Sequence, residues 1–519
     1  MGGGLDMTDL DDVRDPWEPR PGLTHRDADW RGLRVLVAGL GISGFAAADA
    51  LWERGAIVTV VDGAAPGSRR PVDERAQILE VLGVAVRLGS EHTAGMPSDL
   101  DVDLVVTSPG WPPTQPLLAE AARDGIPIWG EVELAWRMRA QSGAAPWLTV
   151  TGTNGKTTTV NMVASILRAS GLRATSAGNV GTPILEAVLH PDPYDVIAVE
   201  LSSFQLHWQR SVSALAAVCL NVAPDHIDWH GSFEDYLEAK GRIYHNAQVA
   251  CVYNVADPLT EELVRRADVV EGCRAVGFTL GVPAVSMVGL VEDVLADRAF
   301  VEQRQHSAAE LANLDDLRGD SSAPVPPHYV ANALAAAALT RAAGVGPLSV
   351  REGLRHFRPD PHRLADAGTI DGVRYIDDSK ATNPHAAAAA LASFEKVVWV
   401  AGGLLKGADV DSLVARFAGC FRGVVLLGQD REIIADAVVR HAPGVPTVDI
   451  GGAETADGTR RDPDDVMDAV VAAAAALAQP GDTVLLAPAA ASMDMFVNYG
   501  ERGRAFADAV RRLASGDGR

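Results

Sequence analysis

A glycine-rich loop between a strand and a helix constrains the fold more than any other feature of this sequence. TGTNGKTT covers Thr151 to Thr158, directly after the apolar run Trp147 to Val150, and opens a helical pattern that continues toward Ser170. Glycines let the backbone turn its N–H groups toward phosphate oxygens, and the start of the helix adds partial positive charge. Since valine stands where the general pattern GxxxxGK[ST] has its first glycine, we predict a variant phosphate loop.

The loop residues have distinct predicted roles. Lys156 would reach the terminal phosphates of a nucleotide, and the Thr157 hydroxyl would be a ligand of Mg²⁺. An ordinary glycine turn before a helix is the alternative, but it does not explain the strand, the GKTT run and the helix together. Further nucleotide contacts are expected from Gly152, Thr153, Asn154, Gly155 and Thr158.

A second glycine loop, GLGISG at Gly39 to Gly44, follows the predicted strand Arg34 to Ala38 and precedes a helical pattern. Asp62 stands about twenty residues further on, at the end of the predicted strand Ile57 to Val61. Such a loop binds a diphosphate, while the carboxylate holds a ribose hydroxyl. The motif alone fits either NAD or a UDP-sugar.

Short β-branched runs alternate with longer alanine- and leucine-rich helical patterns over most of the chain. This alternation is typical of βαβ units around parallel sheets, so the predicted class is α/β. The length of 519 residues predicts about three domains. Later strands are expected at Val196 to Glu200, Ala216 to Asn221, Val397 to Ala401, Val424 to Leu427 and Thr483 to Ala487.

The expected domains follow from breaks in this pattern. We predict a flexible tail over residues 1–30, then domains over 31–143, 144–357 and 358–519. The regular pattern is lost at about 282–327, which predicts an insertion with a proline-rich exit. The charged stretch 454–465 is expected to be a surface loop.

Composition excludes several classes of protein. The net charge of −23 repels polyanions, so nucleic acid is not an expected partner. Four cysteines without a CxxC pair favour a reducing compartment. The first thirty residues lack the pattern of a signal peptide, and no apolar run reaches the length of a membrane span. We therefore expect a cytoplasmic enzyme.

The order of four motifs resembles that of the Mur ligase family: GLGISG, TGTNGKTT, LELSSFQL and DDSKATN. DDSKATN and the Rossmann-like start are most similar to the members that add D-glutamate to UDP-N-acetylmuramoyl-L-alanine. The resemblance runs from about Arg34 to the C-terminal helix. It implies a Rossmann-like UDP-binding domain, a central P-loop ATPase-like parallel sheet, and a C-terminal Rossmann-like domain that receives the amino acid.

The resemblance also implies the chemistry. ATP phosphorylates the substrate carboxylate, and the amine of D-glutamate attacks the acyl phosphate. It implies two Mg²⁺ ions held by Thr157, Glu200, His226 and Lys240, the last as a carbamate whose negative oxygens replace a repelling ammonium. Together with Lys156, Glu200, His226 and Lys240 form the expected catalytic set. We expect the enzyme to be a monomer.

The remaining site residues are transferred from the same resemblance. Contacts with the UDP-linked substrate are expected from Gly41, Ile42, Ser43, Gly44, Asp62, Asn179, Ser202 and Gln205. Contacts with the adenine nucleotide are expected from Asn332, Arg363 and Asp378, and domain closure would complete this site. The D-glutamate pocket is expected to contain Lys380, Thr382, Lys406, Ser492 and Tyr499. The family usually has phenylalanine at the last position, and Gly63 and Ala64 replace larger polar residues after Asp62.

Three other kinds of function would each explain part of these motifs. Another Mur ligase or a folylpolyglutamate synthetase would share GTNGKTT, but DDSKATN argues against both. An NAD-dependent oxidoreductase would explain GLGISG and Asp62, yet it leaves TGTNGKTT and DDSKATN without a role. A catalytically inactive nucleotide-binding scaffold would not need Lys156, Glu200, His226 and Lys240.

Overall fold

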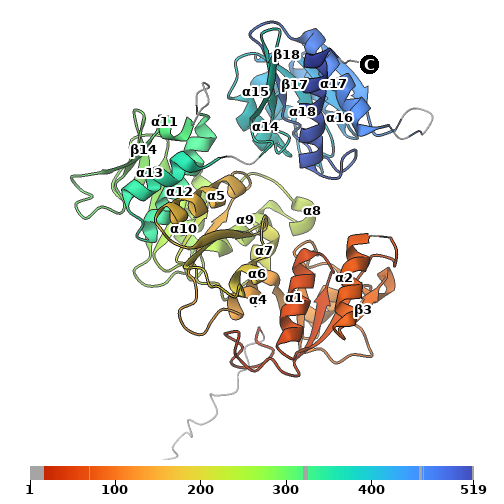
Figure 1. Ribbon diagram of the computed structural model, residues 1–519, viewed down its shortest axis with the longest axis vertical. Helices are drawn as coiled ribbons and strands as arrows, with labels where there is room; N and C mark the ends of the chain where they lie inside the picture. The colour runs from red at the N-terminus through yellow and green to blue at the C-terminus, as the bar shows by residue number, and fades with distance from the viewer. Residues whose placement is uncertain are drawn as a thin grey trace, which may run out of the picture. The chain divides into compact units, whose positions relative to one another are not determined.

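The computed structural model describes residues 17–68, 70–318, 325–358, 361–454, 459 and 461–516. Among these residues the strands form three sheets, each built from one part of the chain (Figure 1). The chain divides into two compact units: residues up to 222 with 227–357, and residues 223–226 with those from 358 onward. The predicted α/β class with three sheet-based domains is confirmed, whereas the domain boundaries stay predictions.

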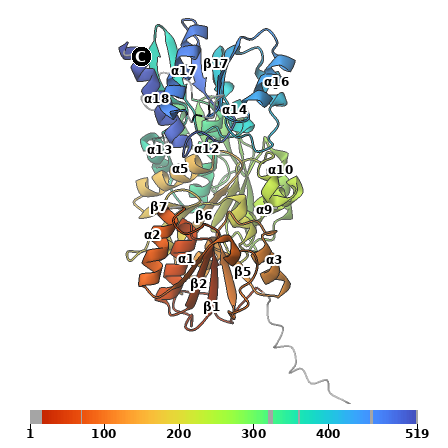
Figure 2. The same cartoon turned by 90° about the vertical axis from the view of Figure 1, so that its right-hand side faces the viewer.

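The first sheet is wholly parallel in the order β3-β2-β1-β4-β5. Figure 2 shows β1, β2 and β5 between α1 and α2 on one side and α3 on the other. The glycine loop leaves β1 where the strand order reverses, which is where ligands bind in open parallel sheets. The elements are β1 (Arg34–Ala38), α1 (Ile42–Glu53), β2 (Ile57–Asp62), α2 (Arg70–Val81), β3 (Ala85–Leu88), η1 (Ser90–His92), β4 (Leu104–Thr107), α3 (Pro116–Arg123), β5 (Ile128–Gly130) and α4 (Glu131–Arg137).

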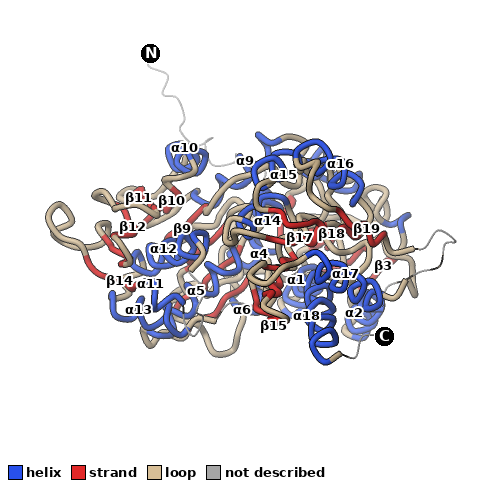
Figure 3. Tube along the Cα trace, turned by 90° about the horizontal axis from the view of Figure 1, so that it is seen from above, coloured by secondary structure: helices blue, strands red, loops and turns tan. Residues whose placement is uncertain are grey.

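The second sheet has the order β14-β13-β12-β11-β10-β9-β6-β8-β7. Strand β6 is fully buried and pairs in parallel with β8 and β9. Helices α5, α12 and α13 pack together (Figure 3). Its strands are β6 (Trp147–Thr151), β7 (Ala174–Gly178), β8 (Val196–Glu200), β9 (Ala216–Cys219), β10 (Ala250–Asn254), β11 (Arg274–Thr279), β12 (Met287–Val291), β13 (Val294–Asp297) and β14 (Ala309–Asn313). Its helices are α5 (Lys156–Ala169), α6 (Ile184–Val188), α7 (Ser203–His207), α8 (Ile227–His230), α9 (Phe233–Gly241), η2 (Arg242–Tyr244), α10 (Pro258–Arg266), α11 (Leu314–Arg318), α12 (Pro327–Ala342) and α13 (Pro347–His356).

The described part of 282–327 is regular in structure, although the sequence pattern is lost there, and its identity as an insertion stays a prediction. β12 continues the sheet, and β13 and β14 add two antiparallel strands to its edge. The β12–β13 pair has Val291 opposite Val294, so Glu292 and Asp293 form a two-residue turn with Glu292 at φ 56°. The usual hairpin signal is Asn-Gly or Asp-Gly, and its absence hid this turn in the sequence. Residues 319–324 lie outside the described part.

The prediction of a flexible tail over residues 1–30 is wrong for residues 17–30, while residues 1–16 lie outside the described part. Leu23 and Trp30 are each 1% exposed. The carbonyl of Trp17 accepts a hydrogen bond of 2.9 Å from the indole of Trp129. A few apolar anchors therefore hold this segment on the first domain, although its average composition is polar.

Helix α4 joins the first two sheets through a buried carboxylate. Glu133 is fully buried and accepts hydrogen bonds from the backbone N–H groups of Arg210 (2.8 Å) and Ser211 (2.9 Å) and from Arg137 Nε (2.7 Å). These hydrogen bonds outweigh desolvation and lower the pKa of Glu133. A paired buried carboxylate of this kind fixes α4 against the central domain.

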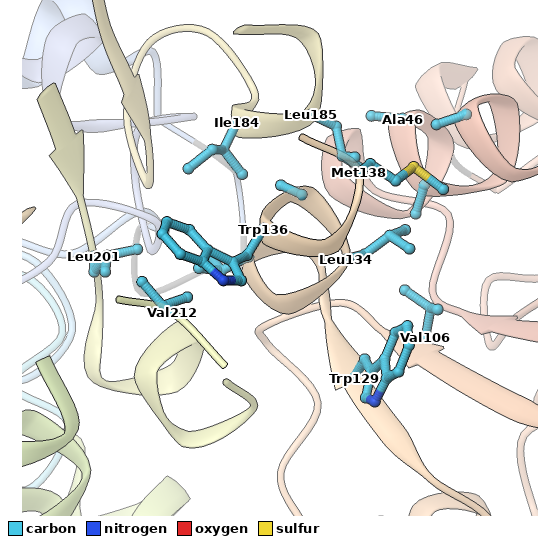
Figure 4. Close-up of a cluster of buried hydrophobic side chains, with 14 of the residues drawn as sticks. Ala46, Val106, Trp129, Leu134, Trp136, Met138, Ile184, Leu185, Leu201 and Val212 are labelled. Atoms are coloured by element: carbon cyan, nitrogen blue, oxygen red, sulfur yellow. The ribbon is translucent and has the colours of Figure 1, made fainter. Parts of the chain in front are cut away.

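Apolar packing reinforces the same junction. Figure 4 shows Trp129, Leu134 and Trp136 in one buried cluster with Leu185 and Leu201 of the central domain. The rings of Trp136 and Trp147 meet edge to face, with centroids 4.9 Å apart. Burial of each such side chain contributes about 1.5–3 kcal/mol. The first two sheets therefore share one continuous core.

The third sheet has the order β15-β16-β20-β17-β18-β19, and only β15 is antiparallel among its described strands. Trp399 on β17 is fully buried and stacks on Phe421, with ring centroids 5.3 Å apart. The strands are β15 (Ala365–Ile370), β16 (Val373–Asp377), β17 (Val397–Ala401), β18 (Phe421–Leu427), β19 (Thr447–Gly451) and β20 (Thr483–Leu486). The helices are α14 (Pro384–Leu391), α15 (Asp411–Phe417), α16 (Arg431–His441), α17 (Pro463–Leu477) and α18 (Tyr499–Ser515).

Candidate active site

The phosphate loop lies at the carboxyl end of β6, between the ends of two neighbouring strands. Val150 is paired with Glu200 of β8, and Thr151 with Cys219 of β9. Gly155 caps α5 in the left-handed region at φ 86°, and a Cβ there would lie 2.5 Å from Asn332 Oδ1. Only glycine fits this close approach without strain. The backbone can therefore turn tightly from the loop into α5.

Side chains from distant segments fix the shape of this loop. Asn221 accepts from the N–H of Asn154 (2.9 Å) and donates to the carbonyl of the same residue (3.1 Å). Lys156 Nζ donates to the carbonyls of Gly152 (2.8 Å) and Thr153 (3.0 Å). The ammonium therefore lies over the loop, as a phosphate-binding lysine requires. The sequence prediction did not include Asn221.

Glu200 is a carboxylate with one free oxygen beside this loop. It is 1% exposed, and Oε1 accepts from Asn179 Nδ2 at 3.0 Å. Oε2 is buried and has no hydrogen-bond partner. Such an oxygen is costly unless a cation or proton pairs with it, so it fits a Mg²⁺ ligand. The structure brings Asn179 and Glu200 together, as expected if both belong to one site.

Ser202 and Gln205 also serve the local structure. Ser202 caps α7, where its hydroxyl accepts from the N–H of Gln205 (3.2 Å) and its own N–H donates to Gln205 Oε1 (3.0 Å). This reciprocal capping box stabilises the start of the helix. Contact of either side chain with a substrate stays a prediction.

The other expected metal ligands are placed separately. Lys240 is 2% exposed at the end of α9, with Nζ 4.7 Å from the ring centroid of Tyr236. His226 adopts φ 53° and belongs to the segment 223–226, which is grouped with the second compact unit. Among the described residues, no cluster of three or more His, Cys, Asp and Glu side chains is arranged to hold a metal ion. Unmodified Lys240 cannot act as an anionic ligand, so the donor set fits magnesium only in part.

In the first domain, Asp62 shapes the glycine loop. Its carboxylate accepts from the N–H groups of Leu40 (2.6 Å) and Ala64 (2.8 Å), so both oxygens already have backbone donors. A Cβ at Gly44 would lie 1.8 Å from the carbonyl oxygen of Gly39, which explains the glycine there. Gly41 caps α1, and Ile42 is 62% exposed. Binding of a ribose by Asp62 stays a prediction, as do the contacts of Ser43.

In the second unit, two residues of the expected amino-acid pocket meet. Lys380 Nζ lies 3.8 Å from the ring centroid of Tyr499, a cation–π contact. The loop before Lys406 pairs with the loop before Ser492 through Leu404 and Ala491. Ser492 is buried, Thr382 is half-buried and Lys406 is exposed. The aromatic ring that replaces the family phenylalanine therefore contacts the DDSKATN segment directly.

Arg502 is a buried organiser of this pocket that the sequence prediction missed. It is 1% exposed and donates to Ser379 Oγ (3.0 Å), to the carbonyl of Ser379 (2.9 Å) and to the carbonyl of Ala490 (3.1 Å). Its burial lowers its pKa to about 10. One guanidinium thereby ties together the segments that carry Lys380 and Ser492.

Asp378 is expected to make the stability of the second unit depend on pH. Burial raises the pKa of this carboxyl from 3.8 to about 7, although the Leu364 N–H and the Arg363 charge oppose the rise. The stabilising contribution of the neutral acid is therefore fully present below pH 3.8 and is lost as pH rises through 7. Asp378→Asn should remove this loss of about 2–3 kcal/mol, so its thermal midpoint relative to wild type should rise by roughly 5–10 °C between pH 5 and 8.

The control for this measurement is Asp436→Asn, which changes an exposed carboxylate on α16. Its thermal midpoint should follow that of wild type across the same pH range. If the difference in thermal midpoint between Asp378→Asn and wild type were the same at every pH from 5 to 8, this would contradict the raised pKa of Asp378.

Among the described helices, none combines the length and hydropathy that crossing a bilayer requires.

Comparisons with known families cover all three parts of the chain. The Mur ligase MurD-like N-terminal domain matches residues 33–130, the Mur ligase middle domain matches 150–340, and the Mur ligase glutamate ligase domain matches 362–490. Among solved structures, MurC from Thermotoga maritima has a TM-score of 0.51 at 20% identity and covers 93% of this chain and 100% of its own. A MurF structure from Acinetobacter baumannii has a TM-score of 0.54 at 17% identity and covers 88% and 90%. These structures share the fold.

Curated relatives are much more similar in sequence. UDP-N-acetylmuramoylalanine–D-glutamate ligase of Streptomyces avermitilis is 58% identical over 94% of this chain and 100% of its own length. The protein of the same name from Thermobifida fusca is 55% identical over 93% and 99%. The chain therefore belongs to the Mur ligase family, within which it groups with the UDP-N-acetylmuramoylalanine–D-glutamate ligases.

Proposed function

We propose that this chain is an ATP-dependent ligase that joins D-glutamate to the alanine carboxyl of UDP-N-acetylmuramoyl-L-alanine, a step of peptidoglycan precursor synthesis. The observation that carries the phosphoryl-transfer half is the loop 152–155 with Lys156 over its carbonyls, beside the buried free oxygen of Glu200. The observations that support the amino-acid half are the contact of Lys380 with the ring of Tyr499 and the hydrogen bonds through which Arg502 joins Ser379 to Ala490.

The reaction divides between these groups. The γ-phosphoryl group of ATP is transferred to a carboxylate oxygen, which forms an acyl phosphate and releases ADP. The amine of D-glutamate then attacks the acyl carbon, a C–N bond forms, the C–O bond to phosphate breaks, and the amine loses a proton. Lys156 and the loop amides would hold the phosphates, and Lys380 and Lys406 would hold the two carboxylates of D-glutamate.

We further propose that two Mg²⁺ ions and a carbamate on Lys240 complete the site. Glu200 Oε2 would supply a hard oxygen for magnesium, which when bound would neutralise charge on the phosphates. Lys240 is buried beside Tyr236, where a carbamate would replace a costly buried cation with an anionic ligand. We also propose that the enzyme acts as a cytoplasmic monomer; light scattering at the mass of a dimer would contradict that state.

The test is an amino-acid panel with the purified protein. In the presence of ATP, Mg²⁺ and UDP-N-acetylmuramoyl-L-alanine, the enzyme should release phosphate at least about tenfold faster with D-glutamate than with L-glutamate or a diamino acid. Equal rates would reject the proposed substrate. The same assay in CO₂-free buffer should lose activity and regain it with bicarbonate, and an unchanged rate would reject the carbamate.

A further inference from the structure

Helix α8 contributes a histidine with two kinds of contact. It contacts the turn with the sequence SSFQ (Ser202 to Gln205, the SSFQ turn), and it contacts a residue that is hydrogen-bonded to the phosphate loop. His230 Nε2 and Ser203 Oγ share a hydrogen bond of 2.9 Å, and Ser203 is 3% exposed. The His230 ring also stacks on Phe204, with centroids 5.7 Å apart. The turn that begins with Ser202 is therefore held from the side by α8.

A second ring contact of the histidine connects it to the phosphate loop. The rings of His230 and Tyr236 meet edge to face, with centroids 5.4 Å apart. Tyr236 is 1% exposed, and its hydroxyl shares a hydrogen bond of 2.8 Å with Thr153 Oγ1. The same ring faces Lys240 Nζ at 4.7 Å. Contacts thus run without a break from Ser203 through His230 and Tyr236 to Thr153.

We propose that His230 is a positioning residue that couples binding of the UDP-linked substrate at the SSFQ turn to binding of Mg²⁺·ATP at the phosphate loop. This inference rests on the proposed function, because it assigns those two ligands to these two segments. The ring of Tyr236 is buried and that of His230 is half-buried, and hydrogen bonds to Thr153 and Ser203 hold them at the two ends, so a shift of one segment is passed to the other. A shift of the turn on substrate binding would reach Thr153 through these contacts.

The experiment measures this coupling in the full-length protein. The Kd of UDP-N-acetylmuramoyl-L-alanine is determined by calorimetry with and without a saturating nonhydrolysable ATP analogue and Mg²⁺. Wild type should bind the substrate at least about fivefold tighter with the analogue present, which is the lower end of typical coupling. His230→Phe keeps the ring and removes the hydrogen bond, and its coupling factor should fall below about twofold.

Two further variants separate coupling from damage to the fold. His230→Gln retains a hydrogen-bonding group near the Nε2 position and should regain part of the coupling. Tyr236→Phe removes the hydroxyl that meets Thr153, and combining it with His230→Phe should cause no additional loss, because both break one path. His306→Phe, an exposed site in the same unit, should leave coupling unchanged.

The outcomes are distinguishable. Wild-type coupling in both His230→Phe and Tyr236→Phe, or wild type that binds both ligands independently, would overturn the role of His230 while leaving the proposed function intact. Failure of wild type to bind either ligand would overturn the proposed function and this inference with it. If His230→Phe unfolds below the assay temperature, the coupling factors of Tyr236→Phe and His230→Gln decide between these outcomes.

Discussion

Lys156→Ala is expected to lower turnover by about 10²–10³-fold, because it removes the one side-chain cation of the sequence TGTNGKTT at Thr151 to Thr158. Lys156 Nζ lies 2.8 Å from the Gly152 carbonyl and 3.0 Å from that of Thr153, at the start of α5. From there it can reach phosphate oxygens as charge develops on them during transfer. Loop amides alone would still bind the nucleotide, so the Kd of ATP should rise less than turnover falls.

The measurement is phosphate release under saturating substrates, together with the Kd of the ATP analogue. Lys396→Ala is the matched control, because Lys396 is an exposed lysine whose Nζ donates to the Gly419 carbonyl outside the expected site. Its turnover should equal that of wild type. Turnover of Lys156→Ala within about fivefold of the control would mean that the phosphates of the reacting nucleotide are bound elsewhere.

The buried strands of this fold could be predicted because their signal is local. Trp147–Thr151, Val196–Glu200 and Val397–Ala401 form strands over the predicted residues, since each is a short, wholly buried run that is rich in β-branched and aromatic residues. The edge strands β12 to β14 are partly exposed, and β12 and β13 are joined by a turn without glycine, so the same signal is weak there. Local pattern therefore predicts the centre of a sheet better than its edge.

The folded segment before β1 escaped prediction for a related reason. The composition of a segment gives only its average polarity. Leu23 and Trp30 are held individually by burial, and Trp17 is held by the hydrogen bond to its carbonyl. The partners that hold them lie more than a hundred residues away in the case of Trp17 and Trp129. No window of the sequence contains both members of such a pair.

The same distinction separates the predicted and missed site residues. Lys156 and Glu200 were predicted because each is placed by the strand next to it. Asn221 and His230 act through partners about 25 to 70 residues away, and neither stands in a motif that sets it apart from other polar residues. Asp62 is a different case. Its position at the end of a strand was predicted, but its carboxylate already accepts hydrogen bonds from the N–H groups of Leu40 and Ala64.

Helix α18 gave a signal that sequence reasoning could have used. Gly500 and Gly503 lie buried in its first turns, although glycine in a helix costs about 1 kcal/mol relative to alanine. Such glycines indicate that another part of the chain approaches the helix closely. Arg502 stands between them and is buried, whereas Arg504 two residues later is exposed. Spacing alone does not distinguish these two arginines.

Arg502→Ala is expected to lower the free energy of unfolding of the second unit by about 3 kcal/mol or more. The change leaves the carbonyls of Ser379 and Ala490 buried without their donor, at about 1–3 kcal/mol for each unsatisfied group, and opens a cavity. Arg502→Lys should recover little, because a single ammonium cannot replace a planar fork that reaches three acceptors. Arg504→Ala is the control on the same helix and should stay within about 0.5 kcal/mol of wild type.

The loss should extend to substrate affinity, because Arg502 holds the segments that carry two residues of the expected amino-acid pocket. Ser379 precedes Lys380, and Ala490 precedes Ser492 by two residues. When both segments become less firmly held, the residues that would bind the carboxylates of D-glutamate no longer keep fixed positions. The KM for D-glutamate should therefore rise at least about tenfold, with a smaller change in the KM for ATP. Urea unfolding and steady-state kinetics check the two effects separately. An unfolding midpoint equal to that of Arg504→Ala would show that the segments hold their places without the guanidinium, and equal rises in both KM values would show that its effect is not confined to the pocket.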